Sequence, residues 1–209
     1  MADYFALLKE PRRPWIDLDR LKSKFLAYTA QEHPDRVLAR SEPERSLATD
    51  RYVEINAAYN CLRNPKERLF HLLELESGTK PKDFDLHPKE SGDLFFQLGR
   101  ECQNADEFLA EGSRIAAPLL KAKWFAQALE RIDQLNALKQ SIAEKQGQII
   151  EELKPLNSLW DSAPPIGTPE RKGGLQLERL EELYRTVGYL ARWSGQIQTR
   201  LVRLSVQTV

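Results

Sequence analysis

The sequence predicts an all-α protein, and three observations support that prediction. Apolar residues recur every three or four positions nearly throughout the chain, as they do along one face of a helix. Runs of β-branched residues are scarce, and only 10 of the 209 residues are glycine. Proline and glycine divide the chain into segments of helical length. We expect an N-terminal helical hairpin with short flanking helices, followed by a C-terminal three-helix bundle or coiled coil.

The first long helix is predicted to follow a short apolar turn over residues 4–8. Either Asp17 or Asp19 can cap the start of this helix. Its apolar face carries Leu18, Leu21, Phe25 and Tyr28. The helix must end near Glu32, because Pro34 disfavours helical geometry at the residue before it and removes a backbone donor.

A second long helix is predicted over about residues 46–62, after a polar stretch at 36–44. Its inward face carries Tyr52, Ile55, Ala58, Tyr59 and Leu62. Pro65 suits the first turn of a short helix that continues over about residues 66–75. We therefore expect one N-terminal domain over residues 1–76.

A connector is expected over residues 77–92, which hold two prolines and two glycines. This segment reads as a linker or a packed connection between domains. It leaves residues 93–209 as a second, C-terminal helical domain.

Three helices are predicted in the C-terminal domain, over about residues 93–110, 118–154 and 175–205. A proline- and glycine-rich loop at 162–174 separates the last two. The last helix carries a heptad seam with one polar break at Ser194, and the seam consists of Leu180, Leu183, Val187, Leu190, Ile197, Leu201 and Leu204. Such helices pack most simply as a bundle or a coiled-coil hairpin with a third helix.

Composition limits the partners and the compartment. The 31 basic residues equal the 31 acidic ones, which argues against general nucleic-acid binding because that needs a basic surplus. The two cysteines, Cys61 and Cys102, form no CxxC pair and no metal-ligand spacing. The N-terminal segment lacks the pattern of a secretory signal, and no stretch approaches the roughly 18 apolar residues of a membrane span. We expect a soluble cytoplasmic protein with no metal, cofactor, nucleic-acid or membrane partner.

The tripeptide His33-Pro34-Asp35 lies between the two long N-terminal helices. Taken alone, these residues fit an ordinary helix end followed by a turn, and any short motif carries a risk of chance occurrence. Their context carries more information. The preceding helix presents Arg20, Lys22 and Lys24 on its other face, although those residues taken alone also fit a solvated helix surface.

At this point the sequence resembles the J-domain family, and within it the HscB subfamily of iron–sulfur co-chaperones. About 75 residues carry the resemblance with order and spacing intact. They are Asp3-Tyr4-Phe5 and Leu7, Ile16-Asp17, Glu32-His33-Pro34-Asp35-Arg36, Ile55-Asn56, Ala58-Tyr59, Leu62-Arg63, Pro65, Arg68 and Leu72-Leu73. The opening Asp-Tyr-Phe and the segment from Pro65 to Leu73 point to HscB rather than to general J-proteins.

The resemblance implies an adaptor that docks on an HscA- or DnaK-like ATPase and favours its hydrolysis-competent state. Arg20, Lys22 and Lys24 would meet an acidic groove of that chaperone. Pro34 would keep the loop backbone rigid, and Asp35 would offer a carboxylate to an arginine of the partner. His33 would orient the loop by hydrogen bonding.

The resemblance also implies that the first helix of the C-terminal domain binds an IscU-like iron–sulfur scaffold protein. The matching apolar patch is Leu94, Phe95, Phe96 and Leu98, although the same residues suit a bundle core. One helical stripe cannot bury all four, so we expect Phe95 or Phe96 to emerge at the surface. The acidic run expected after such a patch is thinner here and is interrupted by Arg100.

The residues favour two other classes of function less. A catalytic pair of His33 and Asp35 is poorly placed across a proline, and no GxSxG motif is present, so we expect no enzyme activity and no catalytic residue. The alternative to the co-chaperone is a helical interaction or scaffold protein that self-associates through residues 175–205, or a general J-protein with a different client. The intact tripeptide and the basic helix favour the co-chaperone.

Overall fold

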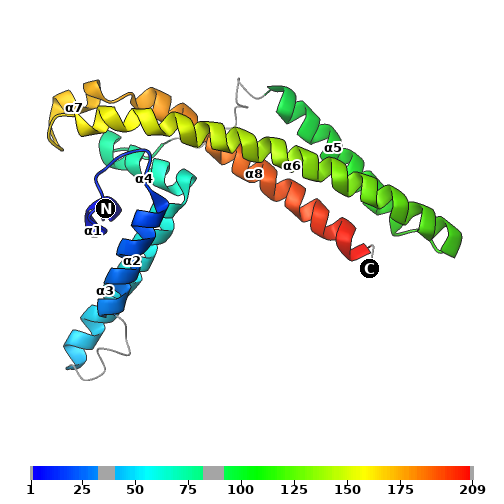
Figure 1. Ribbon diagram of the computed structural model, residues 1–209, viewed down its shortest axis with the longest axis horizontal. Helices are drawn as coiled ribbons and strands as arrows, with labels where there is room; N and C mark the ends of the chain where they lie inside the picture. The colour runs from blue at the N-terminus through cyan, green and yellow to red at the C-terminus, as the bar shows by residue number, and fades with distance from the viewer. Residues whose placement is uncertain (1, 33–40, 82–91, 208–209) are drawn as a thin grey trace. The chain divides into compact units, whose positions relative to one another are not determined.

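The all-α prediction is confirmed by a computed structural model, which describes residues 2–32, 41–81 and 92–207 (Figure 1). No strand occurs within these ranges. The helices are α1 (Tyr4–Leu7), α2 (Leu18–Glu32), α3 (Glu42–Arg63), α4 (Pro65–Ser77), α5 (Gly92–Gly112), α6 (Pro118–Asp161), α7 (Pro169–Gly174) and α8 (Leu177–Gln207). None of the described helices is long and apolar enough to cross a membrane.

The chain forms two compact units. Unit 1 comprises Met1–Asp83 and Ile150–Tyr184, and unit 2 comprises Phe84–Ile149 and Arg185–Val209. Both α6 and α8 therefore contribute residues to each unit. The predicted domain boundaries around residues 77–92 stay a prediction. The structure adds that the end of α6, all of α7 and the start of α8 pack with the N-terminal segment.

The hairpin of unit 1 consists of α2 and α3, which lie side by side (Figure 1). Leu21 of α2 and Ile55 of α3 are buried at their interface. The rings of Phe25 and Tyr59 stack with their centroids 4.1 Å apart. Leu62, at the end of α3, is also fully buried. The apolar periodicity of both segments thus identified the faces that pack, except that Leu18, predicted on the inward face, lies at the start of α2 and is 50% exposed.

The start of α3 differs from the prediction. The helix begins at Glu42 rather than near residue 46, because Ser41 and Glu44 form a capping box. The Ser41 backbone N–H donates to Glu44 Oε2 over 3.0 Å. Pro43 lies in the first turn, where its missing N–H would have no partner within the helix. Pro43, which falls in the polar stretch predicted to precede the helix, is here part of the helix start.

The end of α6 also differs from the prediction. The helix continues past Lys154 to Asp161 and contains Pro155 in its interior. Leu153 and Trp160 are buried on either side of this proline, so packing holds the helix together where propensity alone would end it. The predicted loop at 162–174 is likewise wrong in part, because its last six residues form α7.

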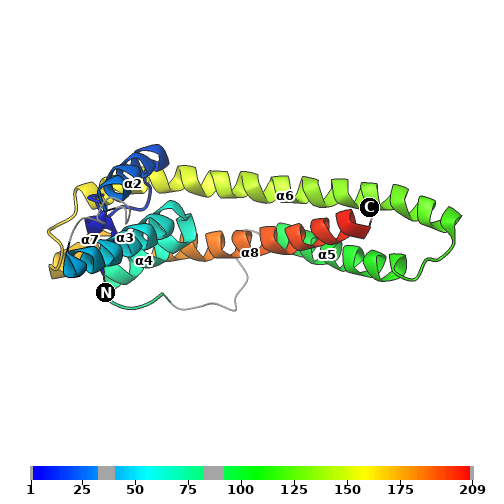
Figure 2. The ribbon, with the colours of Figure 1, turned by 90° about the horizontal axis from the view of Figure 1, so that it is seen from below.

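Unit 2 brings α5 together with the first part of α6 and the second part of α8 (Figure 2). The Phe108 ring of α5 stacks on Trp124 of α6 with the centroids 4.8 Å apart. Phe95 of α5 packs against Trp193 of α8. The seven predicted seam residues of α8 are all buried, from Leu180 to Leu204, which confirms the heptad pattern.

Candidate functional site

The tripeptide His33-Pro34-Asp35 lies outside the described residues. The structure does describe the helices on both sides of it. Helix α2 extends to Glu32, and the capping residue Ser41 starts α3. The two helices form the antiparallel hairpin that the sequence predicts, with the tripeptide in the connection between them.

The three basic residues of α2 do not share one face. Successive residues of an α-helix are rotated by about 100°, so Arg20 and Lys24 lie on one side and Lys22 lies on nearly the opposite side. Lys22 is exposed. It lies between the exposed side chains of Leu18 and Leu26, which are 50% and 54% accessible to solvent. We call Leu18, Lys22 and Leu26 the outer stripe of α2.

The other two basic residues contact the segment before α2. The Lys24 ammonium lies 2.6 Å from Glu10 Oε1 and donates to the Lys9 carbonyl over 2.6 Å. Arg20 Nε lies 3.5 Å from the same carboxylate oxygen. The Glu10 side chain is only 5% exposed. Arg20 and Lys24 therefore neutralise a buried carboxylate, a role that their sequence positions did not indicate.

The four residues predicted to bind a client divide between core and surface. Leu98 is buried, and Leu94 and Phe95 are partly buried. Phe96 is 74% exposed and points away from the bundle core. The prediction that one of the two phenylalanines emerges is therefore confirmed for Phe96. Leu98 is a core residue in this arrangement and offers no surface to a partner.

The acidic residues that follow Phe96 on α5 have partners within the chain. Glu101 pairs with Arg100 over 3.0 Å, and Glu107 accepts a hydrogen bond from Gln103. Asp106 accepts from Arg200 of α8 over 2.5 Å. Of these three acidic residues, Glu101 and Asp106 are paired with arginines, whereas the partner of Glu107 is uncharged.

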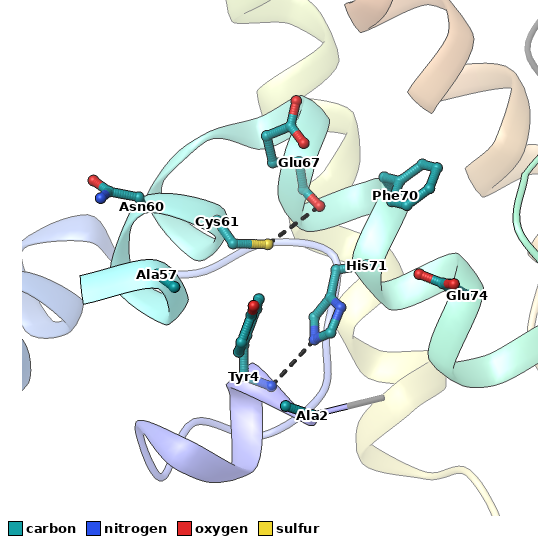
Figure 3. A pocket seen from close by; sticks show the side chains of 9 residues that line it. All are labelled: Ala2, Tyr4, Ala57, Asn60, Cys61, Glu67, Phe70, His71 and Glu74. Carbon is teal, nitrogen blue, oxygen red and sulfur yellow. Dashed lines mark hydrogen bonds between the residues drawn. The ribbon is translucent and has the colours of Figure 1, made fainter. Parts of the chain in front are cut away.

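A cavity of about 440 Å³ opens between α1, α3 and α4 (Figure 3). His71 borders it and accepts a hydrogen bond at Nε2 from the Tyr4 backbone N–H over 3.1 Å. Burial lowers the pKa of His71 below its ordinary value, which favours the neutral ring needed for that bond. The Cys61 thiol faces the Glu67 carbonyl over 3.5 Å, and burial raises the pKa of this thiol to about 11.

The groups around this cavity therefore serve the fold. A neutral His71 holds α1 against α4, and a protonated Cys61 is a poor nucleophile and a poor metal ligand. Within the described ranges, no three His, Cys, Asp or Glu residues lie close enough together to hold a metal ion.

Sequence reasoning missed a buried ion pair in unit 1. Arg171 of α7 donates to both carboxylate oxygens of Glu76 at the end of α4, over 2.7 and 2.8 Å. The hydrogen bond to Glu76 raises the pKa of Arg171. Both side chains are less than 10% exposed. No local signal relates two residues that lie 95 positions apart in the chain.

No protein-family model matches the chain. Over 74 residues, which make up 35% of the chain, it is 39% identical to the co-chaperone protein HscB of Proteus mirabilis strain HI4320. The matched stretch spans 43% of that protein, so the chain aligns with less than half the length of this curated relative.

Two solved structures resemble the fold over 95% of the chain. The chaperone HscB from Vibrio cholerae gives a TM-score of 0.58 at 19% sequence identity, with 96% of that protein covered. Human co-chaperone protein HscB gives 0.59 at 18% identity, with 82% covered. At such identities the structures establish similarity of fold alone. Together with the sequence match, they confirm the resemblance to HscB-type co-chaperones.

Proposed function

We propose that this chain works as an HscB-type co-chaperone in the cytoplasm. In this proposal it is a non-enzymatic adaptor that stimulates the ATPase of an HscA- or DnaK-like chaperone. It also delivers an iron–sulfur cluster scaffold protein of the IscU type to that chaperone. The observation that carries the proposal is the sequence match to HscB, together with a His-Pro-Asp tripeptide between two helices packed as a hairpin.

The chaperone side of the proposal rests on α2 and the tripeptide. An adaptor needs no bond chemistry, because it acts by binding one conformation of the ATPase more tightly than the other. The hairpin core, with Leu21 and the stacked Phe25 and Tyr59 rings, presents α2 as a rigid surface. Little conformational entropy is then lost on docking, which favours tight binding.

The client side of the proposal rests on Phe96. A large aromatic side chain that is 74% exposed is costly to leave in water, and aromatic residues recur as binding hot spots. Phe95 is tied to Trp193, so the backbone that carries Phe96 is fixed on the bundle. Of the predicted client patch, Phe96 is the residue that we assign to direct contact.

The first experiment tests the chaperone side. Steady-state ATP hydrolysis by candidate HscA- and DnaK-type chaperones is measured with increasing amounts of the wild-type chain. We expect stimulation by wild type and loss of stimulation in His33→Gln, with an unchanged thermal unfolding profile. An ATPase rate that does not respond to the wild-type chain, for any such chaperone, would contradict the proposal.

The second experiment tests the client side. Binding of a purified iron–sulfur scaffold protein is measured by calorimetry for wild type, Phe96→Ala and a control, Leu129→Ala. Leu129 belongs to the same unit and is also exposed, at 61%. We expect Phe96→Ala to weaken binding by about 30-fold or more, as hot-spot truncations do, and the control to bind as wild type does. Equal affinities for all three proteins would reject Phe96 as the contact.

A scaffold function is the second candidate, and one surface feature favours it. Val202 and Val206 near the end of α8 are 51% and 70% exposed and line a groove. The exposed valines of one chain could pack against this groove of a second chain, so that two chains associate through α8. Analytical ultracentrifugation distinguishes the two functions, because a dimer that Val206→Asp dissociates, without any chaperone response, favours the scaffold.

A further inference from the structure

Residues 9 and 10 contact one side of α2 along its length. Glu10 pairs with Arg20 and Lys24, and the Lys9 carbonyl accepts a hydrogen bond from the Lys24 ammonium. The Lys9 ammonium lies over the Tyr28 ring, 5.7 Å from its centroid. Positions 20, 24 and 28 are each four residues apart, so they form one stripe of the helix. We call it the tied stripe.

The chain turns tightly to reach this position. Lys9 has a backbone φ of 50°, in the left-handed region that residues other than glycine rarely adopt. Its backbone N–H donates to the Ala6 carbonyl, and that of Glu10 donates to the Phe5 carbonyl over 2.8 Å. The turn delivers the Glu10 carboxylate into a nearly buried position, where a negative charge requires a positive partner. Lys24 and Arg20 fill that requirement.

We infer that Glu10 is a positioning residue that determines which side of α2 meets a partner. It sequesters Lys24 and pairs with Arg20, whose side chain stays 57% exposed. The outer stripe of Leu18, Lys22 and Leu26 is then left as the docking surface. That surface combines Lys22, which has no ion pair among residues 2–32, 41–81 and 92–207, with two exposed leucines. It fits a partner surface with an acidic residue flanked by apolar ones. The inference rests on the proposed function for the identity of that partner, the chaperone ATPase.

The accessibility of the two stripes follows from the same contacts. The Lys24 side chain is 25% exposed, and its ammonium donates to the Lys9 carbonyl and lies 2.6 Å from Glu10 Oε1. Lys22 is exposed and forms no ion pair within the part of the chain that the structure describes. An acidic partner at the tied stripe would have to displace Glu10 from a buried site. An acidic partner at the outer stripe displaces only water.

The first test needs no partner. Lysine amines of the folded full-length chain are acetylated for short times, and the rate at each site is followed by mass spectrometry. We expect Lys24 to react several-fold more slowly than Lys22 in wild type, and the difference to disappear in Glu10→Gln. Equal rates in wild type would overturn the inference, whether or not any chaperone responds to the protein.

The second test uses the concentration of the chain that half-saturates stimulation of the ATPase. We expect Leu26→Ser to raise this half-saturating concentration about tenfold, because the apolar surface that Leu26 would bury against the chaperone is lost. Lys22→Gln should raise it about two- to fivefold, with a smaller effect at high salt. Glu10→Gln combined with Lys24→Gln removes the ion pair between these residues without leaving a buried charge. It should change the half-saturating concentration by less than about twofold.

The outcomes separate this inference from the proposed function. A larger effect from the Glu10 and Lys24 pair than from Lys22→Gln overturns the outer stripe as the docking surface. The absence of any stimulation by wild type contradicts the proposed function instead, and the acetylation rates then still decide whether Glu10 holds Lys24.

Discussion

Unit 1 and unit 2 are stabilised by different kinds of contact. In unit 1, buried polar side chains join segments that are far apart in the sequence. Arg171 donates two hydrogen bonds to Glu76. The Asn157 side-chain amide accepts one hydrogen bond from the Trp15 backbone N–H and donates one to the Trp15 carbonyl, across 142 positions. Buried Arg68 donates to the Pro14 and Leu62 carbonyls, and burial lowers the pKa of Arg68 to about 10.

In unit 2, apolar and aromatic faces carry most of the contact. The α8 seam from Val187 to Leu204 and the Phe108–Trp124 stack are buried, whereas the ion pair between Asp106 and Arg200 is partly exposed. Apolar faces tolerate small shifts, but a bidentate ion pair is satisfied in one geometry only. Unit 1 thus has the segment before α2 and the end of α4 fixed by specific polar contacts with α6 and α7. Unit 2 has the more permissive contacts of a bundle.

The largest expected effect comes from breaking the polar contact of unit 1. Glu76→Gln leaves the Arg171 guanidinium buried without a counter-charge, and we expect it to lower the free energy of unfolding by about 3–5 kcal/mol. Urea denaturation followed by circular dichroism measures the change. The control is Glu152→Gln, which removes a partly exposed partner of Arg179 and should lower stability by no more than about 1 kcal/mol.

A double variant sharpens that prediction. Glu76→Leu with Arg171→Met replaces the ion pair with apolar side chains of similar size, and we expect stability close to that of wild type. A loss as large as that of Glu76→Gln would show that shape, rather than uncompensated charge, dominates at this site.

The next effect tests the apolar packing of unit 2. A methyl group added at Gly112 would overlap the indole of Trp124, so Gly112→Ala should lower the free energy of unfolding by about 1–3 kcal/mol. The matched control is Gly147→Ala at an exposed position of α6, where nothing lies near the added methyl group. That change should stabilise the protein by about 0.4–1 kcal/mol, because alanine favours helix. Thermal denaturation measures both changes. Equal shifts in the melting temperature of the two variants would contradict the packing argument.

The smallest effect concerns pH and the α1 contact in unit 1. The pKa of His71 is lowered by burial, with Asp3 and Glu74 opposing that effect and Arg12 supporting it. As pH falls through 6.5, the unfolded chain binds a proton at this histidine before the folded chain does, so stability decreases. We expect the stability advantage of wild type over His71→Gln to shrink between pH 7.5 and 5.5. An advantage that grows on acidification would show that folding favours the charged ring.

Except for α7, the start of α3 and the end of α6, local spacing predicted the helices, most of their inward faces and the place of the tripeptide along the chain. Those features depend on spacings of three and four residues and on proline and cap residues, which act within one or two turns. The seam of α8 and the exposed Phe96 were therefore within reach of sequence reasoning, the latter as one of two candidates. The continuation of α6 through Pro155 was not, because tertiary packing overrode local propensity there.

Which of the described charges pair with one another depends on the tertiary structure. Glu10, Arg20 and Lys24 are ordinary charged residues in the sequence, and the fold alone shows that they neutralise one another. The same holds for Glu76 and Arg171. A charge buried by folding requires a partner, and the partner is set by distance in space rather than along the chain. The predicted basic face thus separates into a tied stripe and an outer stripe, and of its three cations Lys22 is the one without an ion pair to any residue that the structure describes.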